Sequence, residues 1–154
     1  MRKLLSVAIV GLAFAFTAPS FADDKDPNLK LIKARQGEMQ LRAFNAGPLF
    51  GMAKGNIPYD AEMAASLAAN LKMLLDLDMG RAWAQGTDNE NYPGKTTSLP
   101  KIWTTYPEIG NYGKKYKEAV IALAENAGNG VDALRANIGN LGKSCKACHD
   151  DFRE

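Results

Sequence analysis

Apolar residues recur along this chain at helical spacing, and they predict four helices. An apolar position every three or four residues is typical of an amphipathic helix. Downstream of residue 22, no stretch alternates strictly between apolar and polar residues, so no half-buried strand is predicted. The periodic segments cover about residues 28–53, 61–80 or slightly beyond Trp83, 100–127 and 131–152. In the third segment Pro107 can split off a first turn that carries Ile102 and Trp103.

Residues that start and stop helices stand at the ends of these segments. Asp26, before a proline, is an entry signal for the first helix, and Gly55 ends it. Pro48 inside that helix is expected to kink it, and Asp60 is a good N-cap for the second. Residues 85–99 are rich in Gly, Asn and Asp, which predicts a surface loop. The fold class is therefore all-α, an up-down-up-down four-helix bundle.

The last predicted helix has the strictest pattern. Its apolar positions alternate between spacings of three and four residues and form an a/d seam: Val131, Leu134, Ile138, Leu141, Cys145, Cys148 and Phe152. Both cysteines are thus expected on the buried stripe. Gly139 and Gly142 interrupt the helix. A flat group against the backbone would explain them, and so would simple tolerance of glycine in a well-packed helix.

The start of the chain has the pattern of an export signal. Two basic residues, Arg2 and Lys3, precede an apolar run, and a small-x-small triplet ends at Ala22. We expect residues 1–22 to be a cleaved signal peptide and residues 23–154 to form one domain. A retained anchor is the alternative, but the run is short for a span of about 20 residues.

Composition and charge narrow the function. The 154 residues are 46% hydrophobic and 23% charged, as in a soluble globular domain. Arg2 and Lys3 account for the formal net charge of +2, so the remainder is neutral and gives no support for nucleic-acid binding. No second long apolar segment follows, so no membrane span is expected after cleavage.

The candidate chemistry is a C-x-x-C-H motif in the last helix, formed by Cys145, Cys148 and His149. Two thiols at this spacing can form thioethers with the vinyl groups of haem, and the following imidazole can ligate its iron. The motif therefore predicts one covalently bound haem c per chain, with His149 as the proximal axial ligand.

Other uses of the motif fit less well. A thioredoxin-like C-x-x-C opens a helix in a βαβ unit, whereas this one lies near a helix end. Zinc and iron–sulfur sites need more ligands, and the chain has one histidine and two cysteines in all. A disulfide between positions i and i+3 of a regular helix has poor geometry.

The order of these features resembles the class II cytochromes c, the cytochrome c prime family, and most closely its low-spin cytochrome c-556 branch. The resemblance covers nearly all of residues 23–154. The C-terminal motif is specific, and the others are individually weak but occur in the family's order. The matching segments are Arg35-Gln36 with Met39, Lys54-Gly55 with Pro58-Tyr59-Asp60, Pro100 with Ile102-Trp103, and Ser144 to Asp150 with Phe152-Arg153.

The resemblance implies roles on the other side of the iron. Met39 falls at the distal first-helix position, where the low-spin branch has methionine, so we expect it to be the distal axial ligand. Filling the core is the alternative. Arg35, one turn earlier on the same face, is a candidate for a haem propionate contact, or else a solvated charge. Trp103 and Phe50 would pack on the haem or in the core, and Arg153 would lie near His149.

These expectations lead to a function. His149/Met39 ligation predicts a periplasmic cytochrome that transfers single electrons and is not an enzyme, with an unidentified periplasmic redox partner. The alternative is a five-coordinate cytochrome that binds nitric oxide or carbon monoxide, with Met39 only packing. The periplasm follows from the export signal, since haem is attached to c-type cytochromes outside the cytoplasm. The family includes homodimers built on the first two helices, and a monomer is equally compatible.

Overall fold

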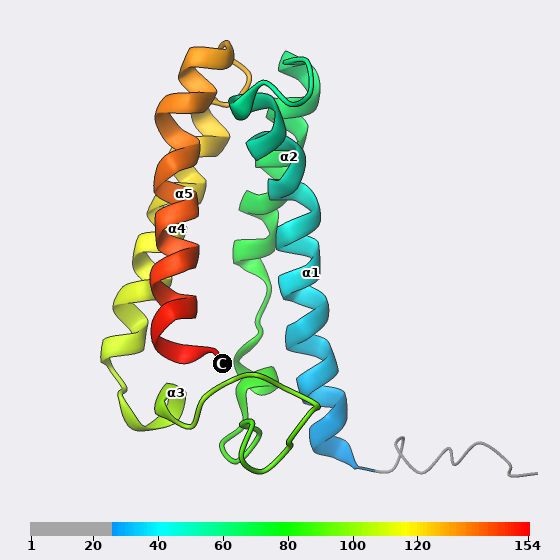
Figure 1. Cartoon of the computed structure of the whole chain (residues 1–154), viewed down its shortest axis with the longest axis vertical. Coiled ribbons are helices and arrows are strands. Elements are labelled where there is room, and N and C mark those ends of the chain that lie inside the picture. The colour runs from blue at the N-terminus through cyan, green and yellow to red at the C-terminus, as the bar shows by residue number, and fades with distance from the viewer. Residues whose placement is uncertain (1–25) are drawn as a thin grey trace, which may run out of the picture.

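Four long helices run along the length of the molecule, and each is antiparallel to the next one in the sequence (Figure 1). The computed structural model describes residues 26–154; the predicted signal peptide lies outside them. The long helices are α1 (Pro27–Lys54), α2 (Ala61–Met73), α4 (Glu108–Asn126) and α5 (Val131–Phe152). In Figure 1, α4 and α5 form one side, and α1 and α2 the other. The prediction of an all-α, up-down-up-down bundle is confirmed.

The helix ends follow the predicted capping residues closely. The Asp26 carboxylate accepts a hydrogen bond from the backbone N–H of Asn28 at 2.8 Å, and Gly55 ends α1 in the left-handed conformation with φ 78°. Pro48 lies within α1, which remains one helix. The Asp60 carboxylate caps α2 by accepting from the N–H of Met63 at 2.8 Å.

The second helix is shorter than predicted. It ends at Met73, and two 3₁₀ turns follow, η2 (Leu74–Asp76) and η3 (Gly80–Trp83). Between these turns the Asp78 side chain accepts a hydrogen bond from the N–H of Gly80 at 3.1 Å. Such local bonds from aspartate offer the backbone an alternative to the helical ladder. A short helix α3 (Lys101–Thr104) then precedes α4.

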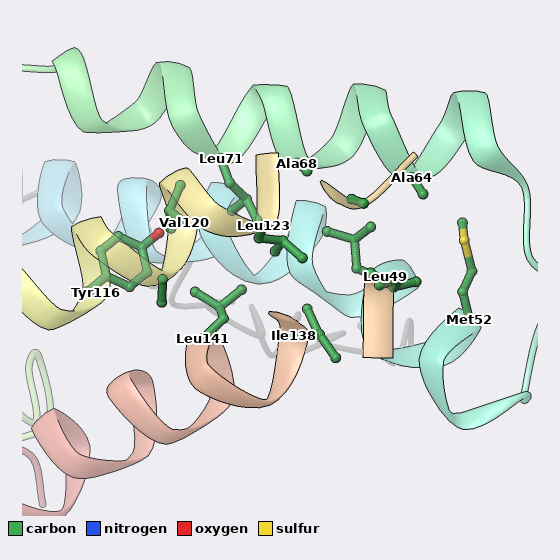
Figure 2. Packing of buried hydrophobic residues seen from close by; sticks show 13 residues of the cluster. Leu49, Met52, Ala64, Ala68, Leu71, Tyr116, Val120, Leu123, Ile138 and Leu141 are labelled. Atoms are coloured by element: carbon green, nitrogen blue, oxygen red, sulfur yellow. The ribbon is translucent and has the colours of Figure 1, made fainter. Parts of the chain in front are cut away.

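Buried apolar side chains from all four long helices fill one part of the bundle. Figure 2 shows this core, with Met52 near one end and Tyr116 near the other. The small Ala64 and Ala68 of α2 are fully buried, which lets neighbouring helices approach closely. The core comprises Leu49, Met52, Ala64, Ala68, Leu71, Tyr116, Ala119, Val120, Leu123, Ala127, Leu134, Ile138 and Leu141.

The end of the bundle near Met52 is closed by hydrogen bonds between its two connections. The Tyr59 hydroxyl donates to the carbonyl of Ala127 at 2.9 Å and accepts from the N–H of Gly130, also at 2.9 Å. Gly130 precedes α5 with φ 110°, a conformation that favours glycine. One residue thus joins the α1–α2 and α4–α5 links. None of the helices in residues 26–154 is long and apolar enough to cross a membrane.

Candidate functional site

A large cavity occupies the other end of the bundle, where α1 begins and α5 ends. Its volume is about 1110 Å³, slightly above the ~300–1,000 Å³ usual for small-molecule pockets. Residues from α1, α4, α5 and the segment after α2 line it. All five predicted site residues border this cavity: Arg35, Met39, Cys145, Cys148 and His149.

The C-x-x-C-H motif lies in the last turns of α5. Cys145 and His149 are one turn apart, and both cysteines are free thiols of intermediate burial. The prediction of two cysteines on a buried stripe is therefore only partly right. The seam packs in the core as far as Leu141, and beyond it Cys145 and Cys148 border the cavity.

Burial in the cavity wall shifts the pKa values of Cys145, Cys148 and His149. Burial raises the pKa of the Cys145 and Cys148 thiols above the ordinary range. Partial burial, and then the positive charge of Arg153, lower the pKa of His149. Its imidazole is therefore neutral at pH 7, which is the form that ligates a metal.

Two methionines border the cavity, Met39 and Met79. Met39 lies in α1, and Met79 precedes the turn η3. Met52 is buried in the core at the far end, whereas Met63 and Met73 are exposed. The distal assignment of Met39 remains a prediction, with Met79 as the competing thioether.

Arg35 is buried, with 2% of its surface exposed, so the alternative of a solvated charge is wrong. It donates hydrogen bonds to the Thr87 hydroxyl at 2.6 Å and the Thr96 hydroxyl at 2.9 Å, and also to the Thr87 carbonyl. Its guanidinium lies 5.0 Å from the ring centre of Trp83 and 5.8 Å from that of Trp103. Arg35 thus anchors the α2–α3 connection to α1; its propionate contact stays a prediction.

The two aromatic residues predicted to pack on the haem or in the core, Phe50 and Trp103, lie in different places: Phe50 borders the cavity, and Trp103 packs against Arg35. Phe50 borders the cavity, and two of its ring atoms lie 3.3 Å from where a Cβ on Gly142 would stand. A close aromatic side chain therefore accounts for Gly142, while nothing lies within 4 Å of such a Cβ on Gly139. Trp103 instead donates its indole N–H to the Trp83 carbonyl at 2.8 Å and packs on Arg35.

The residues after His149 are bonded to the same long connection. The N–H of Leu99 donates to the Phe152 carbonyl at 3.0 Å, and the N–H of Glu154 donates to the Thr97 carbonyl at 2.9 Å. Ser98 and Arg153 form an isolated antiparallel bridge between them. We name these contacts the C-terminal bridge. It fixes the end of α5 beside the connection that Arg35 anchors.

Sequence reasoning missed a polar cluster in the cavity wall. Glu38 and Arg42 of α1 form a salt bridge, and the Arg42 guanidinium lies 4.4 Å from the ring centre of Tyr116 in α4. Glu38 is only 4% exposed. Glu38 and Arg42 at positions i and i+4 resemble an ordinary surface pair, and only their proximity to Met39 could have marked them.

The residues that border the cavity fit a covalently bound haem. Two thiols and an imidazole lie in the required order on one helix end, and a thioether lies on a second helix. The rest of the wall is largely apolar, with side chains such as Leu71, Leu74 and Leu75. This fold and this site define a helical c-type cytochrome.

Comparisons with known proteins agree with that class. The family model described as Cytochrome C' matches residues 30–153. A cytochrome c' of Cereibacter sphaeroides is 37% identical over 153 residues, covering 99% of this chain and 98% of its own. A cytochrome c-554 of the same organism is 31% identical over 161 residues, covering 100% and 99%.

Solved structures match as well. Cytochrome c' from Rhodobacter Spheriodes superposes with a TM-score of 0.80 at 38% identity, covering 83% of this chain and 98% of that one. A ferrous variant of cytochrome c prime from Alcaligenes xylosoxidans with bound NO gives a TM-score of 0.71 at 29% identity, covering 82% and 95%. The chain belongs to the cytochrome c' family, whose members bind a covalently attached haem c.

Proposed function

We propose that this protein is a periplasmic cytochrome that binds a small gas such as nitric oxide or carbon monoxide at a five-coordinate haem c. Cys145 and Cys148 would form the thioethers, His149 would be the proximal ligand, and Met39 would pack over the distal side. The observation that carries this proposal is similarity to cytochromes c' over nearly the whole chain, one of which is described with bound NO.

The chain's own residues give this site its properties. When bound, haem supplies an iron that exchanges single electrons and can accept a diatomic ligand at an open axial position. His149 presents a neutral imidazole from the end of α5, which the C-terminal bridge holds in place. Leu74 and Leu75 contribute an apolar wall that excludes water. Nothing in this arrangement requires a general acid or base.

A second candidate is a six-coordinate electron carrier with His149 and Met39 as axial ligands. The thioether of Met39 on the cavity wall favours it, as does the similarity to a cytochrome c-554. A methionine ligand held in both oxidation states would raise the reduction potential and leave the structure unchanged during electron transfer. In this case the physiological partner is a periplasmic redox protein.

Absorption spectra of the haem-loaded protein separate the two candidates. The gas-binding proposal predicts high-spin spectra in both oxidation states and a shift when carbon monoxide is added to the ferrous protein. Sharp low-spin bands without a carbon monoxide shift would overturn it in favour of the electron carrier. Met39→Ala should leave a high-spin spectrum unchanged but convert a His/Met spectrum to high-spin. The exposed Met73→Ala is the matched control.

Location and assembly complete the proposal. The export signal predicted in residues 1–22 supports a periplasmic location, which fractionation of cells carrying the full chain tests. Leu41 and Phe44 share a face of α1 and are exposed, Phe44 by 74%. Such a face supports a homodimer. Analytical ultracentrifugation should show a dimer that Phe44→Glu dissociates.

A further inference from the structure

The early end of α2 leaves one wall of the cavity without a long helix. Both α2 and α5 pack against α1 and α4, so α2 and α5 face each other across the bundle. In Figure 1 α5 runs down to the C-terminus, whereas α2 stops higher up and the chain below it continues as a narrow trace with short turns. The wall opposite the C-x-x-C-H motif is therefore formed by the turns after Met73, from which Leu74, Leu75, Leu77 and Met79 border the cavity.

Lys117 of α4 borders the cavity on the side of this gap. Tyr112 faces α5, because its hydroxyl donates to the Asp151 carboxylate. Lys117 follows five residues later, about 140° around the helix, and so lies on the side of α4 that is turned toward α2. Gly113 borders the cavity one turn before Lys117, and a Cβ on it would meet nothing within 4 Å. The lysine therefore has open space beside it.

Lys117 is a cation without a partner at the edge of the cavity. It is exposed, and its ammonium forms no hydrogen bond or ion pair within residues 26–154. Arg42, by contrast, is in a salt bridge with Glu38, and the Arg35 guanidinium donates to threonine oxygens. Arg153 lies beside His149, on the α5 side. In this part of the chain the cationic residues that border the cavity are Arg35, Arg42, Lys117 and Arg153.

A haem attached through Cys145 and Cys148 would direct its two propionates toward the gap. In the porphyrin ring the propionates are carried by the two pyrroles opposite those that carry the vinyl groups. Thioethers hold the vinyl edge at α5, so the propionate edge is turned toward the wall after α2. A carboxylate held in an apolar wall without a cation or water is unfavourable, so the propionates need a charged partner or solvent there.

We propose that the Lys117 ammonium forms an ion pair with one haem propionate where the cavity opens beside the end of α2, and that Gly113 leaves the room for this contact. Arg35 contacts the segment after α2 from the α1 side and stays the candidate for the other propionate. The inference rests on the thioether attachment in the proposed function, but it holds for either state of the distal axial position. A cation at the propionate favours the less positively charged ferrous state, so Lys117 should raise the reduction potential.

The test compares the haem-loaded wild type with Lys117→Gln and Lys117→Arg. Spectroelectrochemical titration gives the reduction potential, and resonance Raman spectroscopy gives the bending band of the haem propionates. Lys117→Gln should lower the potential and shift the propionate band, and Lys117→Arg, which keeps the charge, should restore the wild-type potential. The fall in potential should shrink at high ionic strength, because Lys117 is exposed.

Lys114→Gln is the matched control, since Lys114 is an exposed lysine of the same helix that does not border the cavity. It should leave the propionate band unchanged. Because a charge acts more strongly at short range, the fall in potential for Lys117→Gln should be at least about twice that for Lys114→Gln.

Two results would overturn the inference, and they differ in what they say of the proposed function. An unshifted propionate band in haem-loaded Lys117→Gln, or equal potentials for the two glutamine variants, would show that Lys117 does not meet a propionate, while the haem attachment stands. If mass spectrometry of the wild type shows no covalently bound haem, the attachment itself is absent and both proposals fail.

Discussion

Replacing Arg35 by methionine tests whether one buried guanidinium holds the long connection to α1. The variant keeps much of the side-chain volume but loses the hydrogen bonds to the two threonines and the stacking on Trp83 and Trp103. A hydrogen bond to a charged group contributes about 1.5–3 kcal/mol. Because three good bonds are lost, but the desolvation cost of the charge disappears as well, we expect a net loss of about 3–5 kcal/mol.

The assay is urea unfolding of the haem-loaded protein, followed by circular dichroism. For a domain of this size a loss of that magnitude corresponds to a fall in Tm of roughly 10–15 °C. Arg81→Met is the control, since it removes an exposed guanidinium from the same connection. A loss below about 1 kcal/mol for Arg35→Met would refute the reasoning. It would show that other contacts hold the α2–α3 connection against α1, such as the hydrogen bond that the Tyr92 hydroxyl donates to the Asp26 carboxylate.

Three further predictions concern glycine packing, the far end of the bundle and acid stability. Gly128→Ala would place a Cβ 3.0 Å from the Cβ of Ala65 and should destabilise the protein by about 1–3 kcal/mol. Gly139→Ala meets open space within α5 and should stabilise the protein by about 0.5–1 kcal/mol. Equal effects of the two variants in thermal unfolding would contradict this prediction. Tyr59→Phe loses both hydrogen bonds that join the α1–α2 link to the α4–α5 link, and should lower the free energy of unfolding in urea by about 1–3 kcal/mol. An unchanged urea midpoint would show that these bonds do not stabilise the protein. Burial raises the pKa of Asp88, but hydrogen bonds from Asn91 and the N–H of Glu90 outweigh it and hold the pKa below the ordinary value. A carboxylate whose pKa is lower in the folded state contributes stability that is complete above about pH 4 and is lost as the pH falls further. Between about pH 4 and 2 the wild type should therefore lose more free energy of unfolding than Asp88→Asn. Parallel plots of unfolding free energy against pH for the two proteins would argue against this prediction.

Local patterns in the sequence predict most of the architecture. The spacing of apolar residues and the capping residues Asp26, Gly55 and Asp60 place both ends of α1 and α5, and the start of α2, within one residue of their observed positions. The segment predicted over residues 100–127 is instead divided before Pro107 into α3 and α4. The end of α2 is also misplaced, because the apolar pattern continues past Met73 but an aspartate side chain competes with the helical ladder. Apolar periodicity cannot weigh that competition.

The site is predictable only where its chemistry is local. Cys145, Cys148 and His149 are adjacent in sequence, so their order alone predicts a haem. Arg35 contacts residues that lie about fifty to sixty positions away, and its role depends on how the connection folds back. Tyr116 and Arg42 meet only once α1 and α4 are packed, and no sequence spacing relates them.

The C-terminal bridge has a practical consequence for protein engineering. Glu154 lies five residues after His149, and its backbone N–H is paired with the carbonyl of Thr97. A photosensitiser attached to a side chain at position 154 would therefore be held close to the end of the bundle that carries the C-x-x-C-H motif.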